Sequence, residues 1–156
     1  MARALRSERR GRPFKSGHPD INKICFLRMK TILVDLAHTF FIYDKGIFKE
    51  MYDLLESYPN RKILVTNASN EKMKEKGMNN LPYEVFTLEN DPNKSEVKYF
   101  KELLEHYKLN PEDVIYFDHI LDCVKSGELT GITSYYYDES KKDLDKLKEF
   151  LDSNLN

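Results

Sequence analysis

The amino-acid sequence predicts an α/β fold, a three-layer, doubly wound parallel sheet of about five strands with helices on both faces. Two observations support this prediction. Five runs of strand length are separated by segments whose apolar residues recur at helical spacing. Three of the runs are continuously apolar, which is typical of strands buried on both faces of a sheet. Strands that alternate with helices favour a parallel sheet with right-handed crossovers.

The first predicted strand covers residues 30–34, an apolar and partly β-branched run that ends at Asp35. Residues 38–45 are rich in aromatic side chains without a clear period, and we expect an irregular loop there. Apolar residues then recur at helical spacing over residues 47–58, and Pro59 ends the predicted helix.

The second predicted strand, residues 62–67, is again apolar and ends in polar residues. Ser69 is expected to cap a short helix over residues 70–76, which Gly77 terminates. Residues 83–87 form a third, shorter strand. This part of the chain therefore repeats the pattern of strand, helix and strand.

A loop over residues 90–93 delivers Lys94 into the next predicted helix, which ends before Asn110. Residues 114–117 form the fourth predicted strand, which is followed by Asp118. The remaining predicted elements are a helix over residues 121–129, a stop signal at Gly131, a fifth strand over 132–137 and a closing helix over 144–151.

The charge distribution divides the sequence into two parts. Residues 1–28 hold eight Lys and Arg against two acidic residues, whereas residues 29–156 hold seventeen against twenty-four. The first part has no sustained apolar period, so it cannot bury enough apolar surface to offset its ordering entropy. We predict that it is a disordered basic tail or a mis-assigned start ahead of Met29, in preference to a nucleic-acid arm or an Arg-rich transit peptide. Residues 29–156 form the predicted α/β domain, long enough for one core.

The sequence also bears on compartment and partners. No apolar run approaches the ~20 residues that span a bilayer, so we expect no membrane partner. The two cysteines, Cys25 and Cys123, stand far apart and match no metal-binding spacing. A reducing, cytoplasmic compartment is therefore expected.

Polar side chains follow the predicted buried strands. Asp35, Thr66 with Asn67, and Asp118 stand at strand ends, and Lys94 stands at a loop–helix junction. In an open parallel sheet, ligand chemistry collects at the carboxyl ends of the strands. A carboxylate, a hydroxyl, a cation and a second carboxylate suit phosphoryl transfer through an aspartyl-phosphate, with Mg²⁺ screening the anions. There is also an alternative without function: a carboxylate at a strand end could simply face solvent or cap the next helix.

In the order of four motifs the sequence resembles the haloacid dehalogenase (HAD) superfamily of phosphatases and related hydrolases. The family's first motif, Asp-x-Asp-x-Thr, corresponds to Asp35-Leu36-Ala37-His38-Thr39. The other three are a strand ending in Thr66-Asn67, Lys94 before a helix, and a strand ending at Asp118 with Gly131 downstream. The resemblance covers about residues 30–152 and implies a HAD-like, Rossmannoid fold.

The resemblance also implies roles for these residues. Asp35 would be the nucleophile, and Thr66, Asn67 and Lys94 would bind the phosphoryl group. Asp35, Asp118 and the backbone carbonyl of Ala37 would hold Mg²⁺.

The sequence departs from the family pattern at its acidic positions. Ala37 replaces the carboxylate that serves the family as general acid and base, a function worth ~10²–10⁴-fold in rate. His119 replaces the second acid of the fourth motif, and the later acidic position falls on Cys123, with Asp122 one place earlier. His38 is a candidate replacement acid/base. His119 and Asp122 are candidate metal ligands, and His119 would favour another divalent metal over Mg²⁺.

The spacing between motifs leaves no room for a cap domain. Thirty residues separate Asp35 from Thr66, and twenty-seven separate Thr66 from Lys94. An open site suits a phosphorylated small molecule or macromolecule, or closure by a second copy in a homo-oligomer. The aromatic segment 40–43 and the tyrosines 135–137 could form the surface that contacts such a partner. For both segments we favour core or half-buried strand positions instead.

Two functions follow as hypotheses. The first is a phosphatase-type hydrolase acting through Asp35 with altered or weakened acid catalysis. The second is a catalytically inactive HAD-fold protein with a binding or regulatory role. Two further alternatives are disfavoured. A phosphonoacetaldehyde-hydrolase-like chain shares the Asp-x-Ala motif but needs a cap lysine, and a receiver domain needs an acidic pair elsewhere. We expect no nucleic-acid partner.

Overall fold

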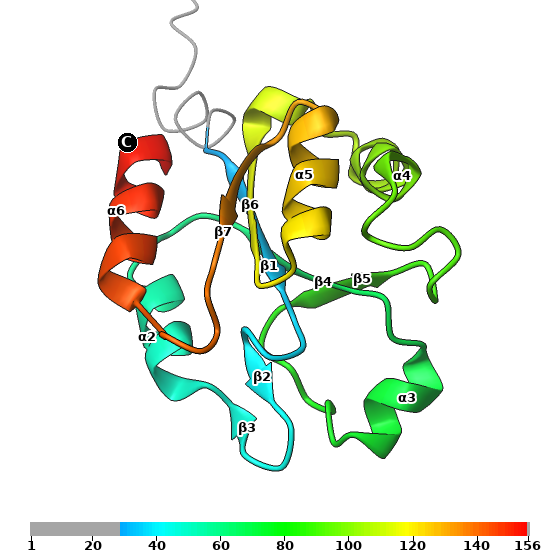
Figure 1. Ribbon diagram of the computed structural model, residues 1–156, viewed down its shortest axis with the longest axis vertical. Helices are drawn as coiled ribbons and strands as arrows, with labels where there is room; N and C mark the ends of the chain where they lie inside the picture. The colour runs from blue at the N-terminus through cyan, green and yellow to red at the C-terminus, as the bar shows by residue number, and fades with distance from the viewer. Residues whose placement is uncertain (1–28, 156) are drawn as a thin grey trace, which may run out of the picture.

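The computed structural model describes residues 29–155, and the tail predicted over residues 1–28 lies outside the described residues. These residues contain a five-stranded sheet with the order β5-β4-β1-β6-β7, and all neighbouring strands are parallel (Figure 1). The strands are β1 (Thr31–Asp35), β4 (Lys62–Thr66), β5 (Glu84–Thr87), β6 (Val114–Asp118) and β7 (Thr133–Tyr136). The chain moves outward from β1 to β5 and then returns to β6 on the other side of β1. The strand order therefore reverses between β1 and β6, where α/β sheets bind their ligands.

Helices cover both faces of the sheet (Figure 1). One face packs against α2 (Lys49–Glu56) and α6 (Leu144–Leu155), and the other packs against α4 (Val97–Tyr107) and α5 (Leu121–Leu129). The central strand serves both cores, because Ile32 and Val34 belong to the first apolar cluster and Leu33 belongs to the second. This arrangement explains the continuous apolar strands and confirms the predicted three-layer α/β fold.

Three of the four short elements lie at or near the carboxyl end of the sheet, and the 3₁₀ helix is the exception. They are the strands β2 (Phe41–Ile42) and β3 (Gly46–Ile47), the helix α3 (Asn70–Glu75) and, elsewhere, the 3₁₀ helix η1 (Pro111–Asp113). The Ser69 hydroxyl accepts a hydrogen bond from the backbone N–H of Lys72, so the predicted cap of α3 is confirmed.

The prediction of an irregular loop over residues 38–45 is wrong in one respect. The segment folds into an antiparallel hairpin of β2 and β3, in which Phe41 faces Ile47. The following helix consequently begins at Lys49, two residues later than predicted. The cause is tertiary, because Phe40 and Phe41 are buried in the core, while Asp44 in the turn and Gly46 at the start of β3 adopt positive φ values.

No cap domain is evident among residues 29–155. Only the hairpin and α2 lie between β1 and β4, and only α3 and β5 lie between β4 and the Lys94 loop. Within the same residues, the helices are all too short or too polar to cross a membrane.

Candidate active site

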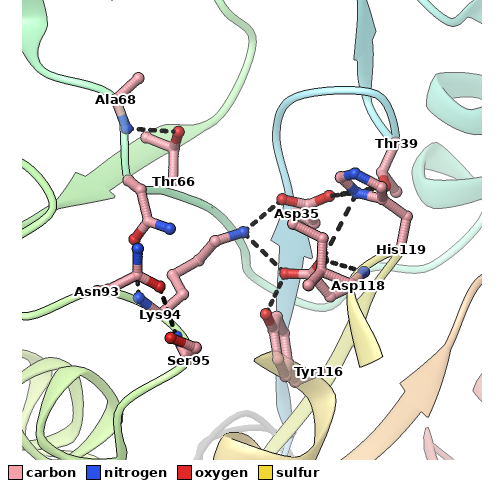
Figure 2. A network of polar contacts seen from close by, with 12 residues as sticks. Asp35, Thr39, Thr66, Ala68, Asn93, Lys94, Ser95, Tyr116, Asp118 and His119 are labelled. Carbon is pink, nitrogen blue, oxygen red and sulfur yellow. Dashed lines mark hydrogen bonds and ion pairs between the residues drawn. The ribbon is translucent and has the colours of Figure 1, made fainter. Parts of the chain in front are cut away.

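The site is built on the ends of the two strands that flank the reversal of strand order. Asp35 ends β1, Asp118 ends β6, and Lys94 comes from the loop before α4 (Figure 2). The Lys94 Nζ donates to Asp35 Oδ1 at 2.5 Å and to Asp118 Oδ2 at 2.8 Å. All three residues are at most 3% exposed. The predicted clustering of these three residues is therefore present in the fold.

The remaining carboxylate oxygens also have partners (Figure 2). Asp35 Oδ2 accepts a 2.8 Å hydrogen bond from the Thr39 hydroxyl and lies 2.5 Å from His119 Nδ1. Asp118 Oδ1 accepts from the backbone N–H of Ile120 at 2.8 Å. Asp118 Oδ2 accepts a second hydrogen bond, from the Tyr116 hydroxyl. Each oxygen of the two buried carboxylates is thus satisfied by the protein.

The two carboxyl groups have opposite pKa shifts. Burial raises the pKa of Asp35, but Lys94 and His119 together outweigh burial and lower its pKa below the ordinary value. Burial and the Asp35 charge raise the pKa of Asp118 against the effect of Lys94. Burial lowers the pKa of Lys94, but the charges of Asp35 and Asp118 raise it overall. Asp35 is consequently held ionised beside a cation, as a carboxylate nucleophile requires.

Thr66 ends β4, Asn67 follows it, and both line the site beside Lys94. The Thr66 hydroxyl accepts from the backbone N–H of Ala68 at 3.1 Å. The Asn67 side chain accepts from the backbone N–H of Lys94 at 2.8 Å, so Asn67 fixes the loop that carries the cation. Tyr99 supports the same strand end by donating to the Thr66 carbonyl.

A pocket of about 440 Å³ opens above the buried charges. Asp35, Lys94 and His119 are among the residues that line it. The other lining residues come from the β1–β2 and hairpin turns, the β4–α3 segment, α3, the β5–α4 loop and the start of α5; they are Ala37, His38, Tyr43, Thr66, Asn67, Ala68, Ser69, Lys72, Glu89, Asn90 and Ile120. A pocket of this size accommodates a small molecule.

The three residues proposed to replace the missing acids, His38, His119 and Asp122, lie at different places relative to the site. His38 lines the pocket with a positive φ of 66°, and its Nδ1 lies 3.6 Å from Glu139 on the loop after β7. Asp35, Asp118 and His119 each offer a ligand atom within 4.8 Å of the others, so they could hold a metal ion. Asp122 is exposed on α5 and is not part of this group. The buried position in that turn belongs to Cys123, whose pKa burial raises to about 12.

Sequence reasoning assigned no role to Thr39 or Tyr116. Thr39 was signalled by its place in the first motif, four residues after Asp35. Tyr116 was signalled by its spacing, because residues two apart on a strand point to the same face. Lys72, Glu89 and Asn90 at the pocket rim gave no signal, since their placement depends on how α3 and the β5–α4 loop fold over the sheet.

Replacing Lys94 by Met will destabilise the fold by about 3–5 kcal/mol, because it leaves Asp35 and Asp118 buried together without their shared cation. Urea unfolding at pH 7 measures the loss. Adding Asp118→Asn to the Lys94 variant removes one of the facing charges and should recover part of it. A loss below about 1 kcal/mol would contradict a buried ionic network.

Replacing Tyr116 by Phe will cost about 1.5–3 kcal/mol of unfolding free energy, because its hydroxyl donates to the buried Asp118 carboxylate. Tyr137→Phe is the matched control. The Tyr137 hydroxyl is also buried, yet it has no hydrogen-bond partner among the described residues, so its removal should be neutral or stabilising. Equal losses in the two variants would show that the space filled by the hydroxyl, not its hydrogen bond, sets the cost.

No protein-family model and no curated protein matches this chain. Solved structures do match it. A HAD family enzyme from Bacteroides thetaiotaomicron, crystallised as a magnesium complex, gives a TM-score of 0.56 at 15% identity over 76% of this chain and 98% of that chain. The core domain of a proposed phosphoglycolate phosphatase from Streptococcus pneumoniae gives 0.54 at 17% identity over 80% and 96%. An uncharacterised protein from Corynebacterium glutamicum gives 0.54 at 14% identity over 80% and 96%. The chain therefore has a HAD-like fold, as its motifs predict.

Proposed function

We propose that this chain is a HAD-like, phosphatase-type hydrolase that transfers a phosphoryl group to Asp35. The observation that supports this function best is the buried Asp35–Lys94–Asp118 arrangement, of which Asp35 and Lys94 line the pocket. It keeps a carboxylate ionised beside a cation where an anionic group can enter. The phosphatase-related neighbours of the same fold support the proposal only at the level of the fold.

The proposed reaction has two steps. An Asp35 oxygen attacks phosphorus and the bond from phosphorus to the leaving-group oxygen breaks, which forms an aspartyl-phosphate. Water then attacks that phosphorus, which releases inorganic phosphate and restores the carboxylate. Lys94 and the Thr66 hydroxyl stabilise the negative charge that spreads over the phosphoryl oxygens. Thr39 orients the nucleophile through its hydrogen bond to Asp35 Oδ2.

The leaving group needs a proton, and Ala37 cannot supply one. His38 lines the same pocket and is the candidate acid/base, with Glu139 beside it. Its ring follows a backbone of positive φ and is partly exposed, so it is less firmly held than a carboxylate on the strand end. We therefore propose weakened acid catalysis.

A divalent cation fits the donor set of the site. Asp35 and Asp118 offer the hard oxygen ligands that Mg²⁺ prefers, and the family motif would add the backbone carbonyl of Ala37. His119 would add a nitrogen ligand only if its Nδ1 gave up the contact with Asp35 Oδ2, and such a ligand would favour another divalent metal. When bound, the ion would supply charge screening between the anionic nucleophile and the anionic substrate.

The pocket size favours a phosphorylated small molecule, such as a phosphate ester or an acyl phosphate. Without a cap the site is also accessible to a phosphorylated macromolecule or to closure by a second copy of the chain. We place the protein in the cytoplasm, because Cys123 is a free, buried thiol.

Two observations favour a second function, binding or regulation without catalysis. The family's acid/base position is Ala37, and protein donors already satisfy both buried carboxylates. The deciding experiment measures phosphate release by the full chain from a panel of phosphomonoesters and acyl phosphates, with Mg²⁺ or Mn²⁺. Metal-dependent turnover is expected. No turnover from folded protein on any substrate would favour the binding function.

A further inference from the structure

We infer that the His119 ring blocks the candidate metal site. Its Nδ1 occupies the space between Asp35 and Asp118 that a cation needs, so a divalent ion binds only after the ring moves away. This inference rests on the metal site of the proposed function. It concerns binding alone, and it requires neither turnover nor a particular charge on the imidazole.

Lys94 and His119 lie against different oxygens of the two carboxylates, which also accept hydrogen bonds from Thr39, Tyr116 and the Ile120 backbone (Figure 2). Asp35 Oδ1 and Asp118 Oδ2 bind Lys94 Nζ. The other two oxygens face His119, whose Nδ1 lies 2.5 Å from Asp35 Oδ2 and 3.5 Å from Asp118 Oδ1. These are the oxygens that Lys94 leaves for a metal, so the ring nitrogen stands where the ion would have to bind.

The short distance indicates a hydrogen bond and not a pair of ligands. Two ligands of one ion, each about 2.0–2.2 Å from it, lie roughly 3 Å apart. The 2.5 Å between Nδ1 and Asp35 Oδ2 is too short for two ligands of one ion and is the separation of a hydrogen bond. An ion has no room between the two atoms while this contact stands, so the contact and metal binding exclude each other.

The His119 ring has polar contacts on one side and adjoins the pocket on another. The His119 side chain is 13% exposed, and its Nδ1 also lies 3.4 Å from the Thr39 hydroxyl. His119 itself lines the 440 Å³ pocket, so open space adjoins the ring on that side. The metal affinity of the whole population then falls by the fraction of molecules in which the ring is away.

The test is metal binding to the full chain without substrate. Calorimetric titration with Mg²⁺, and electron paramagnetic resonance with Mn²⁺, would compare wild type with His119→Ala and His119→Asp. We expect the Ala variant to bind Mg²⁺ at least about tenfold more tightly than wild type. The Asp variant should bind more tightly still, because it adds a hard oxygen ligand.

Two controls bracket the result. His106→Ala removes an exposed histidine on α4 and should leave both affinities unchanged. Asp118→Asn should weaken binding, and thermal unfolding confirms that each variant is folded. Wild type that binds as tightly as His119→Ala, or more tightly, overturns the inference, as does the absence of binding in every variant. Loss of the proposed function would appear separately, as absent turnover with the expected order of affinities intact.

Discussion

With Asp35 as the proposed nucleophile, Asp35→Asn will abolish phosphatase turnover, lowering kcat on the order of 10⁴-fold or more, because the amide cannot form the aspartyl-phosphate. The fold should survive, since Lys94 keeps its ion pair with Asp118 and the residue that replaces Asp35 still offers Thr39 an oxygen acceptor. Phosphate release under saturating substrate measures the loss. Single-turnover trapping of a phosphorylated protein in wild type, absent in the variant, identifies the nucleophile directly.

Asp145→Asn is the matched control for Asp35→Asn. It makes the same chemical change at an exposed position on α6, outside the residues that line the pocket. Its turnover should equal that of wild type. Activity that survives in Asp35→Asn would contradict the proposed nucleophile, and activity lost in both variants would point to a general sensitivity of the protein.

Ala37→Asp will raise turnover by about 10²–10⁴-fold on substrates with poor leaving groups, because it restores a carboxylic acid at the position where the family motif has one. Ala37 lines the pocket two residues after Asp35, so the new carboxyl group reaches the same space as the substrate. The gain should be small for activated aryl phosphates, whose leaving groups need no proton. Comparing the two substrate types separates acid catalysis from a change in binding.

An unchanged rate for Ala37→Asp on both substrate types would show that the missing acid does not limit this protein. His38→Ala in the wild-type and Ala37→Asp backgrounds then shows which group supplies the proton. His38 should matter in wild type and lose its effect once the carboxyl group is present. Turnover that appears only in Ala37→Asp would mark the natural chain as a binding protein built on a catalytic fold.

The central features of the site were readable from the sequence because they depend on short segments and on one rule of topology. Continuous apolar runs specify strands that are buried on both faces, and the polar residue after each run then lies at the carboxyl edge of the sheet. This pattern alone was enough to predict that Asp35 and Asp118 lie close together. The position of Lys94 was predicted from the loop that precedes a helix.

The hairpin of β2 and β3 was beyond this reasoning. Its aromatic residues have no local period, and two-residue strands carry too few positions for one. Phe40 and Phe41 fold inward because the core offers them space, and that space is created by α2 and by strands distant in sequence. Burial set by tertiary contacts overrides local pattern here.

The sequence by itself determined the α/β class, the strand ends and the identity of the buried charges in this protein, since each follows from local hydrophobic pattern. Only the tertiary structure decided which partner each carboxylate oxygen has. His119 lies 84 positions from Asp35, and the contact between them exists because β6 pairs with β1 in one fixed register. A contact of 2.5 Å depends on that register and on side-chain rotamers, which no residue pattern along the chain encodes.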